Sequence, residues 1–310
     1  MKSITDFYLE NMNYLLKEDN LVLSNIRPLS KRIIHSNPIY ICNLEDKYKK
    51  GVIKFHKSRE IMQKEIICNN YLSKKGLSVP KIISFSESPI PHIVMEKISG
   101  KDLSSRDISN CTKDLANIHA LSFKDSGLNK KLKKLTKEER IKDLNENIKI
   151  LRFNSFIDKI YIKKFILLSK LLKKIDYAKW EQCFCFNDFF VNNSMKSKGR
   201  LYYFDFEKAV ISSPFVDVGC IIINYPKKYY QIKSIYIENI TKLIKNNSDG
   251  LDLFIDSGVC EKVIEVAAFL SNDSIKKTKT NNFCKKLAKR KIESVSFIFD
   301  NLKNSFMGEK

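Results

Sequence analysis

The sequence has no long hydrophobic run, which limits where the protein can work. No apolar segment approaches the roughly 20 residues that a membrane-spanning helix needs. The segment 1–20 scatters acidic residues among its apolar ones, unlike a signal peptide. Internal repeats and low-complexity linkers are also absent. We therefore expect a globular protein in the cytoplasm.

Histidine, tryptophan and closely spaced cysteines are scarce as well. The chain has four histidines and one tryptophan. In the sequence, no histidine lies near the acidic residues Asp188, Asp205 and Glu207. Of the eight cysteines, only Cys183 and Cys185 are close together. Without a Cys-x-x-Cys pair or a neighbouring histidine, a zinc site is not expected. Reduced, mostly buried thiols are the better interpretation.

Lysine, in contrast, is in excess. Lys and Arg number 56 against 35 acidic residues, which gives a net charge of +21. Such an excess suits nucleic acid, an anionic membrane surface or an acidic substrate. However, Lys, Asn and Ile are abundant along the whole chain, and lysine runs such as 130–134 are typical of solvated segments. We favour a solvated surface over a nucleic-acid partner.

Hydrophobic periodicity divides the chain into a strand-rich first third and a helical remainder. The 310 residues, 43% of them hydrophobic, suffice for one large domain or two lobes. Early on we expect helices at 4–17 and 58–74 and strands at 26–34, 39–44, 51–55, 79–83 and 92–96. Later we expect helices at about 108–121, 160–175, 229–245, 261–270 and 284–303, with a charged insertion at 124–150 and a loop at 209–214.

The residues with the clearest chemistry lie in the middle of the chain. Asp188 and Asn193 are five residues apart after a short apolar strand. A hairpin with its turn at 196–199 would return Asp205 and Glu207 to the same side. Phosphoryl transfer needs a carboxylate that accepts the hydroxyl proton, and oxygen ligands that hold Mg²⁺ on the nucleotide phosphates. The spacing therefore indicates Asp188 as the base and Asn193, Asp205 and Glu207 as metal ligands.

This pattern resembles that of the choline/ethanolamine kinases and aminoglycoside phosphotransferases. Their motif is His-Gly/Asn-Asp-x-x-x-x-Asn, then a strand ending in Asp-Phe/Trp/Tyr-Glu and a further Asp. Phe186 stands in place of the usual His, which in the family supports the loop, so an apolar ring can take its packing role. Asp217 matches the further Asp and would brace the catalytic loop.

The resemblance implies an α+β, two-lobed, protein-kinase-like fold that uses ATP and Mg²⁺. The small N-terminal lobe would hold an antiparallel sheet with one key helix, and the larger C-terminal lobe would be mostly helical. Residues 1–97 would form the nucleotide-binding lobe. Residues 98–310 would form the catalytic and acceptor-binding lobe.

The resemblance also implies nucleotide-binding residues. Lys54, on an apolar strand, would contact the phosphates and pair with Glu65, with Glu60 as second choice. The covering segment 30–37 lacks glycine, which leaves Ser30, Ser36 and Asn37 as candidates. Met95 would guard the adenine pocket, and the backbone of Glu96 to Ile98 would bind adenine. His119 is expected to be structural.

The leading hypothesis is an ATP-dependent phosphotransferase that moves the γ-phosphate to a hydroxyl of a small molecule. Choline- or ethanolamine-like compounds, amino sugars and aminoglycoside-type antibiotics are all open as acceptors, and the oligomeric state is open too. A pseudokinase that acts as a binding module is the alternative, motivated by Phe186 and the glycine-free loop. A two-metal nuclease is more remote: Asp205 and Glu207 form a DxE pair, but no further acidic motif follows at matching spacing.

Overall fold

The computed structural model describes residues 8–16, 21, 23–29, 38–45, 50–123, 128, 131–154, 157–175, 180, 183–189, 193–244, 250–271 and 280–307. Its contacts divide the chain into two compact units. The first comprises 1–102 and 192–207, and the second comprises 103–191 and 208–310. We predicted a boundary between the lobes after residue 97. The first unit continues to Asp102 and also includes the later segment 192–207.

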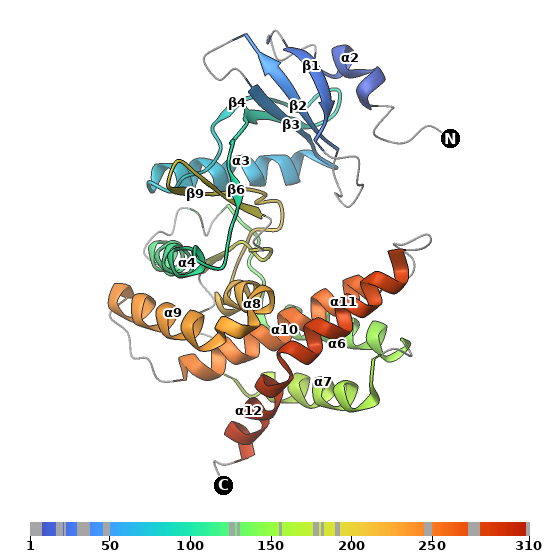
Figure 1. Ribbon diagram of the computed structural model, residues 1–310, viewed down its shortest axis with the longest axis vertical. Coiled ribbons are helices and arrows are strands. Elements are labelled where there is room, and N and C mark those ends of the chain that lie inside the picture. The colour runs from blue at the N-terminus through green and yellow to red at the C-terminus, as the bar shows by residue number, and fades with distance from the viewer. Residues whose placement is uncertain are drawn as a thin grey trace. The chain divides into compact units, whose positions relative to one another are not determined.

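A five-stranded antiparallel sheet forms the core of the first unit (Figure 1). The strands lie in the order β1-β2-β3-β5-β4 and comprise β1 (Leu23–Pro28), β2 (Ile39–Leu44), β3 (Lys50–Phe55), β4 (Ile82–Ser86) and β5 (His92–Glu96). Side chains alternate between the two faces. Ile53 and Val94 pack on one face with Met12 of the short helix α2 (Met12–Leu15). Ile93 and Met95 pack on the other face.

Helix α3 (Arg59–Lys74) covers this second face, where its Met62 contacts Ile93 and Met95. The Ser58 hydroxyl caps the helix by accepting a hydrogen bond from the Ile61 N–H at 3.4 Å. Gly76, with φ +82°, follows its C-terminal end. The predicted helix at 58–74 is confirmed, while β4 begins three residues later than expected.

A small three-stranded sheet completes the first unit. It has the order β6-β8-β9 and contains β6 (Lys101–Asp102), β8 (Ser194–Ser197) and β9 (Arg200–Tyr203). Lys198 and Gly199 both have positive φ, as a two-residue hairpin turn requires. The predicted hairpin exists, but its turn is shorter than predicted because Lys196 and Ser197 belong to the strand.

The second unit is mostly helical. Its elements are α4 (Ile108–Phe123), α6 (Lys137–Arg152), α7 (Lys159–Leu172), β7 (Cys183–Cys185), β10 (Val210–Ser212), α8 (Phe215–Asn224), the 3₁₀ turn Pro226–Lys228, α9 (Tyr229–Ile244), α10 (Leu251–Ser271), α11 (Thr280–Ser294) and α12 (Ser296–Met307). Helix α10 packs against α6, α8, α11 and α12 (Figure 1). A Cβ on Gly258 would overlap the Phe215 carbonyl oxygen, so α8 and α10 approach with almost no space between their backbones.

Several predictions for this unit were wrong in detail. The charged segment 124–150, for which no shape was predicted, contains most of α6, which begins with a capping box between Thr136 and Glu139. Helix α10 starts about ten residues earlier than predicted. The expected helix at 284–303 is two helices separated at Val295. The expected loop 209–214 contains β10, which pairs with β7.

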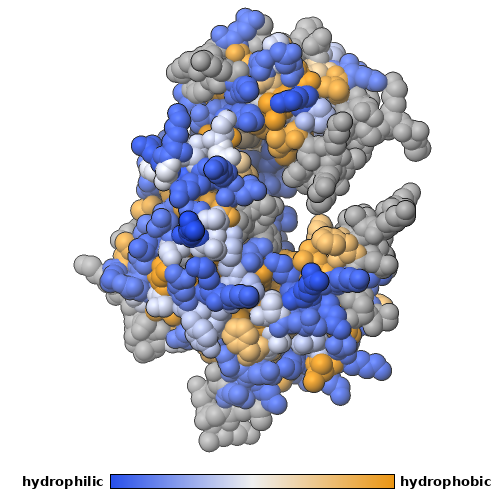
Figure 2. All heavy atoms as spheres, in the orientation of Figure 1, coloured by the Kyte–Doolittle hydropathy of each residue, from blue (hydrophilic) through white to orange (hydrophobic). Residues whose placement is uncertain are grey.

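Polar side chains dominate the face of the molecule that Figure 2 shows. Figure 2 shows hydrophilic residues spread over both units in this view, with smaller apolar areas between them. All eight cysteines are free, and seven of them are buried. Within the described ranges, no helix is long and apolar enough to cross a membrane.

Candidate active site

Strand β3 and helix α3 bring a lysine and a glutamate together in the first unit. Lys54 Nζ lies 2.6 Å from Glu65 Oε2, and both side chains are buried. Lys54 lies two residues after Val52 in β3, so the two side chains are on the same face of the strand. Because Val52 packs with residues of α3, the side chain of Lys54 also points toward this helix. Glu60, the second choice from sequence, is exposed in the first helical turn.

The same lysine also meets the acidic residues after β9. Lys54 Nζ lies 2.7 Å from Asp205 Oδ1 and 4.0 Å from Glu207 Oε2. Burial alone would lower the pKa of Lys54, but the negative charges of Glu65, Asp205 and Glu207 outweigh it and hold this pKa above its usual value. Burial raises the pKa of Glu65 despite its lysine partner. Lys54 is therefore a permanent cation among carboxylates.

His56 lies beside this cluster without joining it. Its Nε2 is 3.7 Å from Glu65 Oε2, beyond hydrogen-bond distance, and within the described part of the chain neither ring nitrogen has a hydrogen-bond partner. Burial, together with the positive charge of Lys54, lowers the pKa of His56 to about 3. The ring is neutral at physiological pH.

The hairpin positions the predicted metal ligands of the first unit. The Phe204 N–H donates to the Asn193 carbonyl at 3.1 Å, so the residue next to Asp205 is tied to Asn193. Asp205 has φ +68°, a left-handed conformation that a non-glycine residue rarely adopts and that often marks functional positions. Two carboxylates and an amide oxygen are the ligands that Mg²⁺ prefers. The donor set therefore suits Mg²⁺.

The predicted nucleotide-binding residues fall in two groups. Ser30 and Ser36 lie outside the described residues. Met95 is buried against α3. The Glu96 N–H donates to the Lys81 carbonyl at 2.9 Å, so a contact of Glu96 with adenine would have to use its carbonyl oxygen. The adenine-binding role of Met95, Glu96 and Ile98 stays a prediction.

In the second unit, Asp188 follows β7 in a loop held through its backbone. Asp217, in the first turn of α8, is fully buried. Its carboxylate accepts hydrogen bonds from the Phe186 N–H at 2.7 Å and the Asn187 N–H at 2.8 Å. Asn187 has φ +58°, which turns the chain sharply just before Asp188. Asp217 is thus tied to the backbone just before Asp188, and its role in catalysis stays a prediction.

The phenylalanine that replaces the family histidine packs into the core. Phe186 is 3% exposed, and its ring centroid lies 5.2 Å from that of Phe184 and 4.6 Å from that of Phe189. The aromatic ring fills space beneath the loop, while Asp217 fixes the backbone above it. Within the described residues 183–189, these contacts are made without a histidine at position 186.

Two lysines next to the loop could not be assigned from sequence. Lys262, on α10, is fully buried and donates to the Asn187 carbonyl at 2.8 Å. Lys208 Nζ lies 3.2 Å from Asp188 Oδ2. Lys262 leaves a weak signal as a lone cation in an apolar helix, and Lys208 directly follows Glu207.

The histidine of α4 reaches the same core. His119 Nδ1 lies 2.8 Å from the Tyr236 hydroxyl, and Nε2 lies 3.3 Å from Asp217 Oδ2. The ligand atoms of His119, Cys183 and Cys185 also lie within 4.8 Å of one another, a proximity that sequence spacing did not reveal. Because both ring nitrogens already have polar partners, we interpret His119 as structural.

An acidic cavity of about 330 Å³ adjoins the loop. Asn187 and Cys185 form part of its wall. Four carboxylates and one guanidinium line it: Asp143, Glu146, Glu261, Glu265 and Arg140.

Only two of these carboxylates are matched by cations. Arg140 pairs with Glu261 at 2.6 Å, and Lys262 pairs with Glu265 at 2.9 Å. Within the described residues, no ion pair involves Asp143 or Glu146. Burial, and next the charge of Glu146, raises the pKa of Asp143. The lining therefore carries more negative than positive charge.

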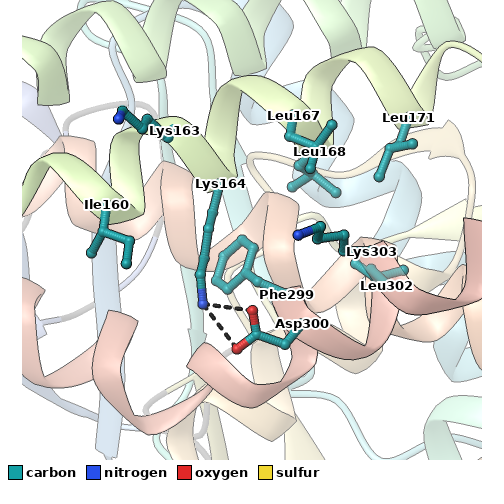
Figure 3. A pocket seen from close by; sticks show the side chains of 10 residues that line it. All are labelled: Ile160, Lys163, Lys164, Leu167, Leu168, Leu171, Phe299, Asp300, Leu302 and Lys303. Atoms are coloured by element: carbon teal, nitrogen blue, oxygen red, sulfur yellow. Dashed lines mark hydrogen bonds and ion pairs between the residues drawn. The ribbon is translucent and has the colours of Figure 1, made fainter. Parts of the chain in front are cut away.

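A second cavity, of about 280 Å³, lies between α7 and α12 (Figure 3). Its floor is apolar, with Leu167, Leu168 and Phe299 among its lining residues, and Lys164 pairs with Asp300 at 2.7 Å beside it. None of its lining residues belongs to the predicted site.

The structure thus assembles the predicted residues in two sets. Lys54, Glu65, Asp205 and Glu207 come together in the first unit. Asp188, Phe186 and Asp217 come together in the second. The meeting of Asp188 with Asp205 at one metal-bound phosphate stays a prediction.

Fold and residue pattern together define a kinase-like phosphotransferase, and comparisons with known proteins agree. Residues 34–230, more than half of the chain, match the model of the phosphotransferase enzyme family (APH). The chain belongs to this family. A search of curated proteins finds no match. Family membership does not support the nuclease alternative.

Solved structures with similar folds include small-molecule kinases. Amicoumacin kinase hAmiN, in complex with AMP-PNP, Ca²⁺ and Ami, has a TM-score of 0.68 at 13% identity and covers 96% of this chain and 94% of its own. Choline kinase from Cryptosporidium parvum Iowa II has a TM-score of 0.63 at 12% identity, covering 96% and 97%. Plasmodium vivax ethanolamine kinase has a TM-score of 0.59 at 16% identity, covering 94% and 89%. At these identities the similarity establishes the fold.

Proposed function

We propose that the protein transfers the γ-phosphate of ATP, with Mg²⁺, to a hydroxyl of a small molecule that carries a positively charged amine. Asp188 would accept the hydroxyl proton. Asn193, Asp205 and Glu207 would hold the metal, and Lys54 would bind the nucleotide phosphates. Bound Mg²⁺ would neutralise charge on the phosphates. The similar amicoumacin kinase hAmiN was solved with AMP-PNP and Ca²⁺, which supports a nucleotide and a divalent cation as cofactors.

The observation that carries the acceptor assignment is the acidic cavity beside the loop. Asn187, which lines the cavity, directly precedes Asp188. A cation held by Asp143 and Glu146 would therefore keep a neighbouring hydroxyl of the same molecule near the base. Choline- and ethanolamine-like compounds, amino sugars and aminoglycosides all combine an amine with a hydroxyl. The cavity favours this chemical class over neutral alcohols.

Phe186 was one of the two motives for the pseudokinase alternative. The backbone contacts that Asp217 and Lys262 make with Phe186 and Asn187 support the kinase proposal over that alternative. The glycine-free segment 30–37 lies outside the described residues.

A paired acceptor panel tests the proposal. Phosphate transfer from Mg-ATP is measured for ethanolamine, choline, glucosamine and an aminoglycoside, each against a neutral analogue such as propanol or glucose. We expect kcat/KM to favour the charged member of a productive pair by about 10- to 100-fold, as for one charged hydrogen bond or ion pair. Asp143→Asn should raise KM for that acceptor about tenfold and leave KM for ATP unchanged. Equal use of charged and neutral acceptors would refute the acceptor assignment.

A further inference from the structure

The lysine that contacts the predicted base is fixed there by strand register. In the ribbon of β7 and β10, Val210 pairs with Cys185. Lys208 precedes Val210 and Asp188 follows Cys185, so antiparallel pairing brings both to the same end of the ribbon. Their 3.2 Å contact follows from this register.

The contact is poorly explained as a stabilising device. The side chain of Lys208 is 50% exposed, and exposed ion pairs add little stability. Lys262 provides the contrast, because it is fully buried and fixed between Asn187 and Glu265. Lys262 holds the loop, whereas Lys208 can rotate about a flexible stem while staying next to the carboxylate.

We infer that Lys208 is a further catalytic residue, which binds the oxygens of the phosphoryl group during transfer; this inference rests on the proposed function. A hydroxyl activated by Asp188 must lie within hydrogen-bond distance of its carboxylate. The attacked phosphorus must then lie about 3–3.5 Å from that hydroxyl oxygen. An ammonium already 3.2 Å from Asp188 Oδ2 reaches the phosphoryl oxygens by a side-chain rotation.

The charge changes of the step favour this movement. As the acceptor oxygen bonds to the γ-phosphorus, the hydroxyl proton passes to Asp188. The bond from the γ-phosphorus to the β–γ bridging oxygen breaks, and ADP leaves with the electron pair. Lys208 stays protonated throughout. Asp188 loses its negative charge when it is protonated, so its attraction for Lys208 weakens. At the same moment negative charge is spread over the phosphoryl oxygens, which then attract Lys208.

Steady-state kinetics of three variants test the inference. We expect Lys208→Met to lower kcat about 100-fold, as removal of one transition-state donor does. KM for ATP and for the acceptor should stay within about threefold, because the contact is made in the transition state. Lys208→Arg should retain most of kcat, and added ethylammonium should partly restore Lys208→Ala. Lys242→Met, which removes an exposed lysine paired with Glu238 on α9, is the control and should match wild type.

Further outcomes separate this inference from the proposed function. Calorimetry should give the same Kd for Mg-AMP-PNP in wild type and Lys208→Met, and the unfolding midpoint should not change. A Lys208→Met protein with wild-type or higher kcat would overturn the inference alone. A fall in kcat without rescue by either Arg or ethylammonium would also overturn it. If wild type transfers no phosphate to any acceptor, the proposed function and this inference both fail.

Discussion

Replacing the buried carboxylate that holds the catalytic loop should unfold the second unit more easily. Asp217 accepts two backbone hydrogen bonds, from Phe186 at 2.7 Å and from Asn187 at 2.8 Å, and it is fully buried. In Asp217→Asn, one of the two carboxylate oxygens becomes an NH₂ group that faces an N–H donor. One backbone N–H therefore loses its acceptor, and the other loses its charged partner.

The magnitude is worked from these two backbone contacts; the longer contact of Asp217 Oδ2 with His119 Nε2, at 3.3 Å, is not counted. A buried donor without a partner costs about 1–3 kcal/mol, and the hydrogen bond that remains loses about 1 kcal/mol when its acceptor is no longer charged. We expect the free energy of unfolding to fall by about 2–4 kcal/mol. The loop should also become less ordered, so phosphate transfer should fall even in the fraction that remains folded.

Urea unfolding of the full chain, followed by far-UV circular dichroism, measures the difference. Glu238→Gln is the matched control, since Glu238 is an exposed carboxylate that pairs with Lys242 along its own helix. The control should unfold at the wild-type urea concentration. If Asp217→Asn unfolds at that same concentration with the same slope, the loop is not held by Asp217 and the reasoning is wrong.

Three further predictions concern the first unit and the helical core. Lys54→Met should lower kcat/KM for ATP on the order of 100-fold and destabilise the chain by about 3–5 kcal/mol, because Glu65 is left buried without its cation. Adding Glu65→Gln to this variant should restore much of the stability but not the activity. A recovery of activity in the double variant would contradict the account. The pKa of His56 is about 3 in the folded chain and about 6.5 in the unfolded chain. Between pH 6.5 and pH 3, His56 is therefore protonated in the unfolded chain only. The free energy of unfolding consequently falls as the pH drops from 6.5 towards 3. From pH 7 to 5 this loss is about 2 kcal/mol, and urea titrations of His56→Gln should show a correspondingly weaker pH dependence; an equal dependence in both proteins would count against a buried neutral ring. Gly258→Ala should lower the free energy of unfolding by about 1–3 kcal/mol, because the new Cβ would overlap the Phe215 carbonyl between α8 and α10. Thermal unfolding measures this change. An unchanged midpoint would show that the two helices can separate freely.

Local signals in the sequence predicted much of the fold. Ser58 and Gly76 mark the two ends of α3, and the alternating strands of the first third predict its sheet. Helix α6 was predictable in principle, because Thr136 and Glu139 form a capping box. The break at Val295 was not, because neither proline nor glycine interrupts the helical pattern there.

The site residues that follow a short sequence motif were predictable. Those that come together only because distant elements pack against each other were not. Asp188 and Asp205 stand out by spacing alone. In contrast, Lys262 reaches the loop from 75 residues away through tertiary packing. The acidic cavity combines carboxylates of α6 and α10, and neither helix looks unusual by itself. Its charge becomes visible only when the two helices are placed side by side.

Transfer of ³²P from γ-labelled Mg-ATP to an amine-bearing hydroxyl compound, compared between wild type and Asp188→Asn, tests the central claim most directly. We predict that wild type labels the acceptor, and that Asp188→Asn still binds Mg-AMP-PNP but loses transfer by at least about 100-fold, as expected for removal of a general base. Transfer by Asp188→Asn at the wild-type rate would contradict the account.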